Sequence, residues 1–267
     1  MADINRKSRI VVKLGTSTLT HKTGRLNIRR IERIVKNLAD IHNAGHDIIL
    51  VSSGAIGLGM AKLGLKEKPK ETPLKQACAA IGQCELMYFY DKLFSDYNLN
   101  VAQMLLTKYI LLDDRKKNVQ NALRELLSYN VIPVVNENDT VAIDELELEV
   151  GENDSLAATV ATLAEADLLI IMSDIDGFYD SDPRQNPDAK LISVVHEIDD
   201  RIRELAGEAG TSLGTGGMRT KINAAQIAND NGIDMLIVNG RDPDVLYDIF
   251  DGKVVGTLFR AKKDREV

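Results

Sequence analysis

The amino-acid sequence predicts an α/β fold in which helices cover both faces of a mainly parallel central sheet, a three-layer α/β/α sandwich. Short, continuous apolar runs alternate along the chain with longer segments in which apolar residues recur at helical spacing. Continuous apolar runs are typical of strands that are buried on both faces. Most of these runs end in a small or polar turn, as strands of a doubly wound sheet do at the edge where ligands bind.

The first strand is predicted over residues 9–14, where the segment RIVVKL leads into a turn of small residues. Asn27 can cap the helix that follows, and Gly45 can end it. The next strand covers residues 47–52 and leads into a glycine-rich turn at residues 53–59. Strand, helix and strand in this order predict a right-handed parallel crossover.

The same alternation continues towards the end of the chain. Further strands are predicted at residues 101–107, 131–135, 167–172, 191–195 and 235–238, and a last one ends near residue 258. Further helices are predicted at residues 74–97, 113–129, 151–164, 198–206 and 218–231. Polar and proline-bearing segments predict exposed loops at residues 66–73 and 178–190, and an alternating pattern predicts an antiparallel hairpin at residues 142–150.

Composition excludes several classes of function. A hydrophobic content of 44% and a charged content of 27% are ordinary for a soluble globular protein of 267 residues, with one or two domains. No apolar run is long enough for a membrane span or a signal peptide, so we expect a cytoplasmic protein without a membrane partner. A net charge of −7 and a pI near 5.2 argue against binding to nucleic acid.

Neither the cysteines nor the histidines show the spacing of a metal site. Cys78 and Cys84 lie in a predicted helix and are expected to be buried free thiols. The histidines are scattered along the chain, so we assign them no chemistry and predict no metal-ligating residue.

Residues 213–221, LGTGGMRTK, have the character of a phosphate-binding loop that leads into a helix. Glycines let the backbone approach an anion, N–H groups at a helix start point towards it, and Lys221 adds a positive charge. The two commonest nucleotide fingerprints do not fit, because one requires glycine at Thr220 and the other requires glycine at Arg219. A flexible turn is the alternative interpretation of this segment taken alone.

Several strand ends are expected to meet at one edge of the sheet. The turns after the strands follow Lys13, Ser53, Asn136, Ser173 and Val238. Together with residues 213–221 they combine lysines from both halves of the chain, glycine-rich turns and two clusters of acids and amides. This combination suits phosphoryl transfer, which requires positioning and charge neutralisation more than covalent chemistry. Lys13 considered alone could instead extend to the surface.

Five segments of the sequence resemble the amino-acid kinase family in their order and spacing. They are VVKLGTS at 11–17, VSSGAIG at 51–57, VVNENDTVA at 134–142, GENDSLAA at 151–158 and GTGGMRTK at 214–221. Within that family the likeness is to the enzymes that act on L-glutamate. It implies ATP-dependent phosphorylation of the γ-carboxylate of L-glutamate to L-glutamyl 5-phosphate, the first step of proline biosynthesis. It also implies one kinase domain over residues 1–267, with a lobe mainly for glutamate at 1–165 and a lobe mainly for ATP at 166–267.

The resemblance assigns roles to individual residues. Lys13 and Lys221 would contact the transferring phosphoryl group, and Asp154 would orient both lysines. The residues that would bind glutamate are Ser53, Gly54, Asn138, Asp139 and Asn153. Those that would bind ATP are Lys13, Ser173, Asp174, Thr215, Gly216, Gly217, Met218, Arg219, Thr220 and Lys221. Mg²⁺ would be held mainly through the phosphates of ATP.

The implied reaction agrees with the chemistry of these residue types. An ionised carboxylate is already a nucleophile at neutral pH, so no general base and no catalytic histidine are expected. Two lysines and Mg²⁺ would offset the repulsion between the carboxylate and the triphosphate. A free amino acid also carries an α-ammonium, which the carboxylate of Asp139 could pair with.

Other interpretations of the sequence stay open. The chain could be another member of the family, such as N-acetylglutamate kinase or aspartokinase, or a nucleotide-binding sensor that keeps the fold without the chemistry. The resemblance suggests a homodimer or homotetramer and feedback inhibition by proline. Many relatives of this branch carry an RNA-binding-like domain of the PUA type after the kinase motifs, which this sequence is expected to lack.

Overall fold

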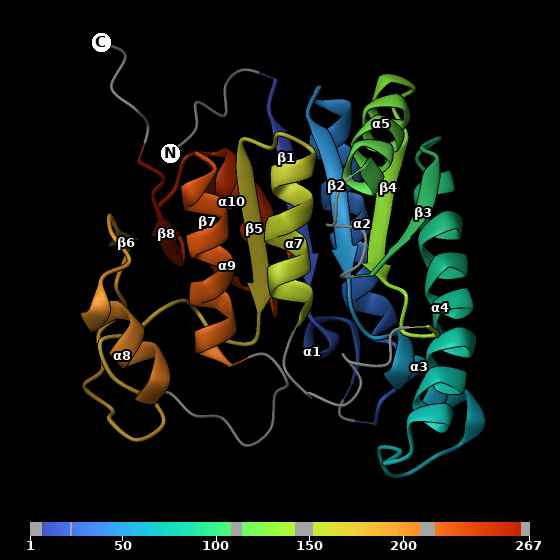
Figure 1. Cartoon of the computed structure of the whole chain (residues 1–267), viewed down its shortest axis with the longest axis horizontal. Coiled ribbons are helices and arrows are strands. Elements are labelled where there is room, and N and C mark those ends of the chain that lie inside the picture. The colour runs from blue at the N-terminus through green and yellow to red at the C-terminus, as the bar shows by residue number, and fades with distance from the viewer. Residues whose placement is uncertain (1–6, 22, 108–113, 142–151, 209–216, 263–267) are drawn as a thin grey trace.

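A central sheet runs through the molecule (Figure 1). The structure is a computed structural model that describes residues 7–21, 23–107, 114–141, 152–208 and 217–262. The strands are β1 (Arg9–Leu14), β2 (Asp47–Ser52), β3 (Val101–Leu106), β4 (Ile132–Glu137), β5 (Leu168–Ser173), β6 (Val194–Val195), β7 (Asp234–Asn239) and β8 (Thr257–Phe259). Over the described residues they form one sheet in the order β3-β4-β2-β1-β5-β7-β8-β6.

The sheet is mainly parallel. Every pairing from β3 across to β7 is parallel, whereas β8 runs antiparallel to β7 and pairs with β6 at the edge. The strands that are covered on both faces are buried along almost their whole length, as their continuous apolar sequences predict. The carboxyl ends of the parallel strands therefore meet at one edge, the lower edge in Figure 1.

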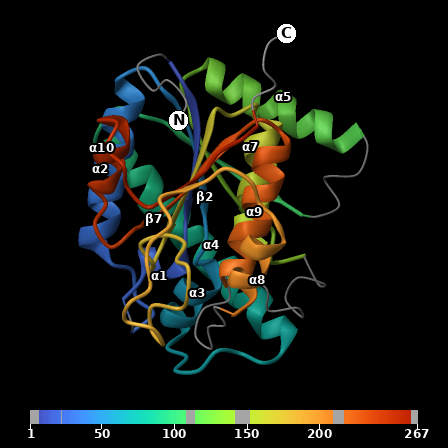
Figure 2. The same cartoon turned by 90° about the vertical axis from the view of Figure 1, so that its left-hand side faces the viewer.

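Helices form the two outer layers (Figure 2). They are α1 (Thr16–Leu19), α2 (Ile28–Asn43), α3 (Ala55–Leu63), α4 (Thr72–Ser95), α5 (Asp114–Ser128), α7 (Glu152–Leu163), α8 (Asp200–Glu208), α9 (Met218–Asp230) and α10 (Val245–Phe250). One hydrophobic core joins α2, α4 and α10 to a face of the sheet, and a second joins α5, α7 and α9 to the opposite face. The predicted α/β/α sandwich is confirmed.

Helices α3 and α4 cross at unusually short range. A Cβ on Gly82 would lie 1.7 Å from the carbonyl oxygen of Ala55, and one on Gly59 would lie 1.8 Å from that of Cys78. Only glycine permits two backbones to approach this closely. Because α3 begins at the end of β2, the crossing fixes the position of α4 relative to the carboxyl edge of the sheet.

The structure corrects several details of the predicted elements. Residues 53–59 are a turn only as far as Gly54, and α3 begins at Ala55. The small-residue turn after β1 contains the one-turn helix α1. Strand β4 extends to Glu137 because β3 supplies backbone partners for its last residues, and the strand expected at 191–195 is reduced to β6.

Other predictions have separate outcomes. Asn27 caps α2 as predicted, since its side chain accepts a hydrogen bond from the backbone N–H of Arg30 at 3.2 Å. Cys78 is buried, but Cys84 is exposed, so the expectation of two buried thiols is wrong for Cys84.

The hairpin expected at 142–150 lies outside the described residues. Each helix in the described part of the chain is too short or too polar to cross a bilayer.

Candidate active site

Strand β1 lies at the point in the sheet where the order of the strands along the chain reverses. The strands that follow it in the first half of the chain extend to one side, and β5 and β7 extend to the other. Lys13 lies near the carboxyl end of β1, level with Val51 of β2 and Ile171 of β5. The loops after neighbouring strands diverge at such a point, and this divergence opens a binding site in doubly wound folds. Lys13 therefore lies at the expected place for a ligand.

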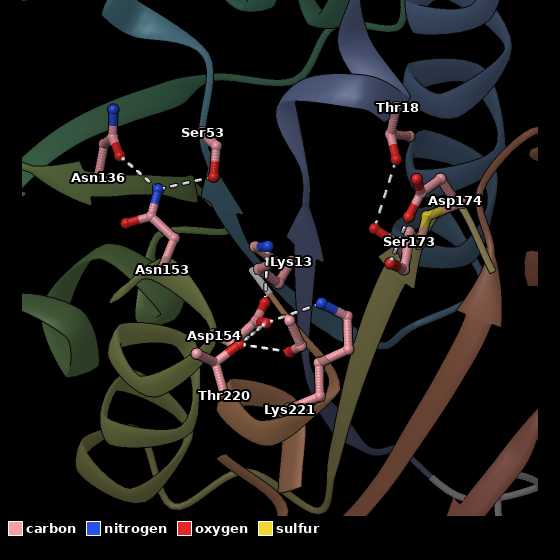
Figure 3. Close-up of polar contacts among 12 residues, drawn as sticks. Lys13, Thr18, Ser53, Asn136, Asn153, Asp154, Ser173, Asp174, Thr220 and Lys221 are labelled. Carbon is pink, nitrogen blue, oxygen red and sulfur yellow. Dashed lines mark hydrogen bonds and ion pairs between the residues drawn. The ribbon is translucent and has the colours of Figure 1, made fainter. Parts of the chain in front are cut away.

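Asp154 joins lysines from the two halves of the chain (Figure 3). Its Oδ1 lies 2.6 Å from Nζ of Lys13, and its Oδ2 accepts a hydrogen bond from Nζ of Lys221 at 3.0 Å. Thr220 lies beside this pair, with Oγ1 at 3.2 Å from Oδ2 of Asp154 and 2.8 Å from the carbonyl oxygen of Gly217. The side chain of Asp154 has no exposed surface, so both ammonium groups are held by a buried carboxylate.

Helices α7 and α9 bring these groups together. They pack side by side, with Asp154 in the first turn of α7 and Lys221 near the start of α9. A carboxylate at a helix N-terminus is favoured by the helix dipole, but a lysine there is disfavoured. Lys221 is nevertheless only 4% exposed. The ion pair with Asp154 stabilises the lysine at this position, and the backbone N–H groups of the same helix start also favour an anion.

Burial and mutual charge set the protonation of the site. Burial lowers the pKa of Lys13, and the positive charge of Lys221 lowers it further, while the carboxylate of Asp154 raises it in part. Burial by itself would raise the pKa of Asp154, but the two lysines outweigh burial and hold that pKa below its ordinary value. Asp154 is therefore ionised at neutral pH. The three groups carry two positive charges against one negative charge, which suits a phosphate ligand.

A second cluster lies beside the lysines, on the side of β2 and β4. Nδ2 of Asn153 donates to Oγ of Ser53 at 2.7 Å and to Oδ1 of Asn136 at 3.1 Å. Nδ2 of Asn136 in turn donates to Oε1 of Gln83 at 2.8 Å. Gly54 follows Ser53 with a φ of 102°, a conformation that favours glycine, and this turn directs the chain into α3.

An open pocket of about 340 Å³ adjoins this second cluster. It lies between α4 and the ends of β3 and β4, and its walls include Gln83, Cys84, Asn138 and Asp139. Asn138 and Asp139 follow β4 and are half-buried. The pocket shares Gln83 with the second cluster, so it places carboxylate and amide groups next to that cluster, in a space that a small amino acid could enter.

A third cluster lies on the other side of the lysines, at the ends of β1, β5 and β7. Oγ of Ser173 donates to Oδ1 of Asp174 at 3.3 Å, and Oγ1 of Thr18 donates to the carbonyl oxygen of Met172 at 3.4 Å. Gly240 donates its N–H to the carbonyl oxygen of Ser173 at 2.7 Å. A Cβ on Gly240 would lie 2.9 Å from Cγ2 of Thr18, so the loop after β7 must stay small to approach α1.

The structure thus places most of the residues singled out from the sequence at one edge, in three adjoining groups. The middle group consists of Lys13, Asp154, Thr220 and Lys221. On the side of β2 and β4 lie Ser53, Asn153, Asn138 and Asp139, and on the other side lie Ser173 and Asp174. Gly217 precedes α9, Met218 packs into the core, and Arg219 is exposed. Thr215 and Gly216 lie outside the described residues. The expectation that Lys13 could simply extend to the surface is wrong, because it is only 8% exposed.

Three polar residues of the site were missing from the sequence-based assignment. The sequence places Asn136 in the polar turn after a strand that ends at Val135, without a binding role, and it does not single out Thr18. One feature of the sequence could have identified Gln83. It is a polar residue in the otherwise mainly apolar buried face of α4, between Ala79 and Leu86. A buried amide in such a stripe requires a hydrogen-bond partner, which here is Asn136.

The described residues show no arrangement of three or more His, Cys, Asp or Glu side chains that could hold a metal ion. The absence of protein metal ligands stays a prediction for the chain as a whole.

Comparison with known proteins defines the class to which this fold and site belong. The sequence model of the amino acid kinase family matches residues 8–239, and the chain belongs to that family. The chain resembles glutamate 5-kinase of Clostridium perfringens, with 54% identity over 96% of each chain, and that of Clostridium tetani, with 54% identity over 95% of each. The structure of carbamate kinase from Giardia lamblia bound to AMP-PNP has the same fold, with a TM-score of 0.66 and 18% identity over 96% of this chain and 99% of that one.

Proposed function

We propose that this protein transfers the γ-phosphoryl group of ATP to the γ-carboxylate of L-glutamate. The product is L-glutamyl 5-phosphate, and the reaction is the first step of proline biosynthesis. One observation carries the proposal: Lys13 and Lys221 share the buried carboxylate of Asp154 between an amide-rich pocket and the Ser173–Asp174 turn. The similarity to glutamate 5-kinases over nearly the whole chain supports this choice of substrate.

The reaction requires little covalent chemistry from the protein. A γ-carboxylate oxygen attacks the γ-phosphorus, the new O–P bond forms, and the bond to the β,γ-bridging oxygen breaks, leaving ADP. The nucleophile is ionised at neutral pH, so no proton has to be removed. Lys13 and Lys221 neutralise charge on the transferring group, and Asp154 holds both ammonium groups in place before the substrates arrive.

Glutamate would bind in the lobe formed mainly by residues 1–165. Ser53, Gly54 and Asn153 lie beside the lysines and would hold the end of the substrate that is phosphorylated. Asn138 and Asp139 line the adjoining pocket and would hold the amino-acid end, with Asp139 paired to the α-ammonium. This pairing favours a free amino acid over an N-acetylated one.

ATP would bind in the lobe formed mainly by residues 166–267. Ser173 and Asp174 lie at the end of β5, and Thr220 and Lys221 lie in the first turn of α9, which faces the shared carboxylate. Thr215 and Gly216 precede this turn in the sequence and belong to the proposed ATP site. The backbone N–H groups at a helix start favour a phosphate. Mg²⁺ would arrive on the phosphate oxygens of ATP and neutralise part of their charge.

Two further properties belong to the proposal. We expect a homodimer or homotetramer, and we expect proline to inhibit by competing with glutamate, since it shares the ammonium and the carboxylate. Inhibition that weakens as glutamate rises would support competition. Inhibition independent of glutamate concentration would contradict it.

The test of the proposed function is a substrate panel. ATP consumption by the purified protein is measured with L-glutamate, N-acetylglutamate and L-aspartate, with Mg²⁺ present, and the acyl phosphate is trapped with hydroxylamine. We expect kcat/KM to be highest for L-glutamate and the product to be its γ-hydroxamate. Preference for the acetylated substrate or for aspartate would identify another amino-acid kinase, and ATP binding without turnover would indicate a sensor.

A further inference from the structure

Gln83 is the end of a hydrogen-bonded chain of amides that leads to the candidate glutamate site. The side chain lies on α4, is 7% exposed, and accepts through Oε1 from Nδ2 of Asn136 at 2.8 Å. Oδ1 of Asn136 accepts from Asn153, and Asn153 donates to Ser53 (Figure 3). Four side chains from α4, β4, α7 and the end of β2 are thus connected in sequence.

The chain has a single consistent direction. An amide nitrogen only donates and an amide oxygen only accepts. Nδ2 of Asn153 donates to both Ser53 and Asn136, so Asn136 must present its oxygen to Asn153 and its nitrogen to Gln83. If Asn136 turned over, its nitrogen would face the nitrogen of Asn153, and two donors would meet. The acceptor that Gln83 provides is what keeps Asn136 in the required orientation.

The direction of the chain determines what Ser53 can offer to a substrate. Oγ of Ser53 accepts from Asn153, so the hydroxyl proton of Ser53 is left to donate to another acceptor. A substrate carboxylate is such an acceptor. Asn153 has both N–H groups engaged, so its Oδ1 faces away from Ser53 and Asn136 (Figure 3).

Helix α4 holds Gln83 rigidly at this position. Gly82 fixes the close crossing with α3, and the hydroxyl of Tyr90, two turns further along, lies 2.8 Å from Oγ of Ser52. Nε2 of Gln83 has no hydrogen-bond partner among the described residues. Among the described residues, the side chain of Gln83 therefore forms its hydrogen bond with Asn136. Helix α4 is positioned by other contacts, those of Gly82 and Tyr90.

We propose that Gln83 is a positioning residue for glutamate. Its Oε1 sets the orientation of Asn136, and through Asn136 and Asn153 it directs the proton of Ser53 towards the substrate carboxylate. This inference rests on the proposed function, in which Ser53 and Asn153 bind glutamate.

The test compares Gln83→Met with Gln76→Met, a matched change on the same helix at a half-buried glutamine outside the amide chain. For Gln83→Met we expect the glutamate KM to rise roughly tenfold, which corresponds to the loss of one hydrogen bond in a partly buried site. The ATP KM and the melting temperature should stay near those of the wild type. Gln83→Leu serves as a second variant if the methionine variant folds poorly.

A double-mutant cycle with Asn136→Ala tests whether Gln83 acts through Asn136. We expect the glutamate KM of the double variant to equal that of Asn136→Ala alone, because the acceptor has nothing left to orient. Fold-changes that multiply would overturn the positioning role, and so would a Gln83→Met variant whose glutamate KM matches that of Gln76→Met. A wild-type protein that does not consume ATP with glutamate would instead refute the proposed function, so the two failures are distinguishable.

Discussion

Lys13 Nζ lies 2.6 Å from Oδ1 of Asp154, a carboxylate that is buried completely beneath the carboxyl edge of the sheet. Because Asp154 also holds Lys221, one carboxylate sets the positions of two ammonium groups that are far apart in sequence. In the proposed reaction this positive charge would be in place before the substrates bind, which would avoid reorganisation during phosphoryl transfer.

This ion pair predicts an alkaline limit to activity. Burial and the neighbouring Lys221 lower the pKa of Lys13, so its charge is lost below the ordinary lysine value of 10.5. If charged Lys13 stabilises the transition state, kcat/KM should fall as pH rises through the lowered pKa. In Asp154→Asn the attraction that partly restores this pKa is gone, so the limb should move to still lower pH. The pH dependence of kcat/KM in wild type and in Asp154→Asn measures the alkaline apparent pKa, which belongs to the coupled groups together. An alkaline apparent pKa that is the same in both proteins would contradict the assignment.

The same pKa shifts predict that the free energy of unfolding rises with pH in two separate windows, an alkaline one for Lys13 and an acidic one for Asp154. Between its lowered folded pKa and 10.5, Lys13 binds fewer protons in the folded protein than in the unfolded chain, so its contribution makes the free energy of unfolding rise with pH in that window. Asp154, whose folded pKa is depressed below 3.8, contributes stability at higher pH that is lost as pH falls through the folded pKa. Denaturant unfolding of wild type and Asp154→Asn as a function of pH separates the two contributions. An acid limb that is identical in both proteins would count against the role given to Asp154.

A substitution of Asp139 tests whether this residue binds glutamate and not ATP. Asp139→Asn keeps the shape of the side chain but removes its charge, and we expect a loss of about 2–4 kcal/mol in kcat/KM for glutamate with the ATP KM unchanged. If Asp139 instead only stabilises the turn after β4, the variant should lose thermal stability and affect both substrates alike. Steady-state kinetics with each substrate varied, together with the melting temperature, decide between these roles. An unchanged glutamate KM would rule out pairing with the α-ammonium.

The close contact at Gly82 predicts how much folding stability is lost when a side chain forces α3 and α4 apart. A methyl group at this position would meet the carbonyl oxygen of Ala55 at 1.7 Å, so Gly82→Ala should destabilise the fold by about 3 kcal/mol. The control is Gly207→Ala in α8, where a Cβ would meet no described atom within 4 Å outside its own helix, so alanine should stabilise the exposed helix by up to about 1 kcal/mol. Chemical denaturation of the two variants measures the contrast. If the two variants had equal free energies of unfolding, the close crossing of α3 and α4 would not contribute to stability as described.

The sequence predicted the strands and the site edge well because buried parallel strands have continuous apolar sequences and end in distinct turns. It also identified Lys13 and Lys221 as unusual, since each lies in a segment where a charge requires an explanation. It did not predict that β4 includes Asn136 and Glu137, because backbone pairing with β3 is independent of side-chain polarity.

The pairing of side chains within the site could not be derived from periodicity. The role of Asp154 came from family resemblance, since no local pattern shows that a residue of α7 faces both β1 and α9. Gln83 was missed because its partner, Asn136, lies 53 residues away and is reached only through the crossing of α3 and α4. Contacts between distant segments depend on the packed structure rather than on local sequence.

The central claim is that the two lysines held by Asp154 stabilise the transferring phosphoryl group. The most direct measurement is the rate of phosphoryl transfer in a single turnover with labelled ATP and glutamate, in wild type, Lys221→Met and Lys13→Met. We expect each variant to fold normally, to bind both substrates within a few-fold of wild type, and to transfer the phosphoryl group at least about 10²-fold more slowly. A near-wild-type rate in either variant would contradict the role of that lysine.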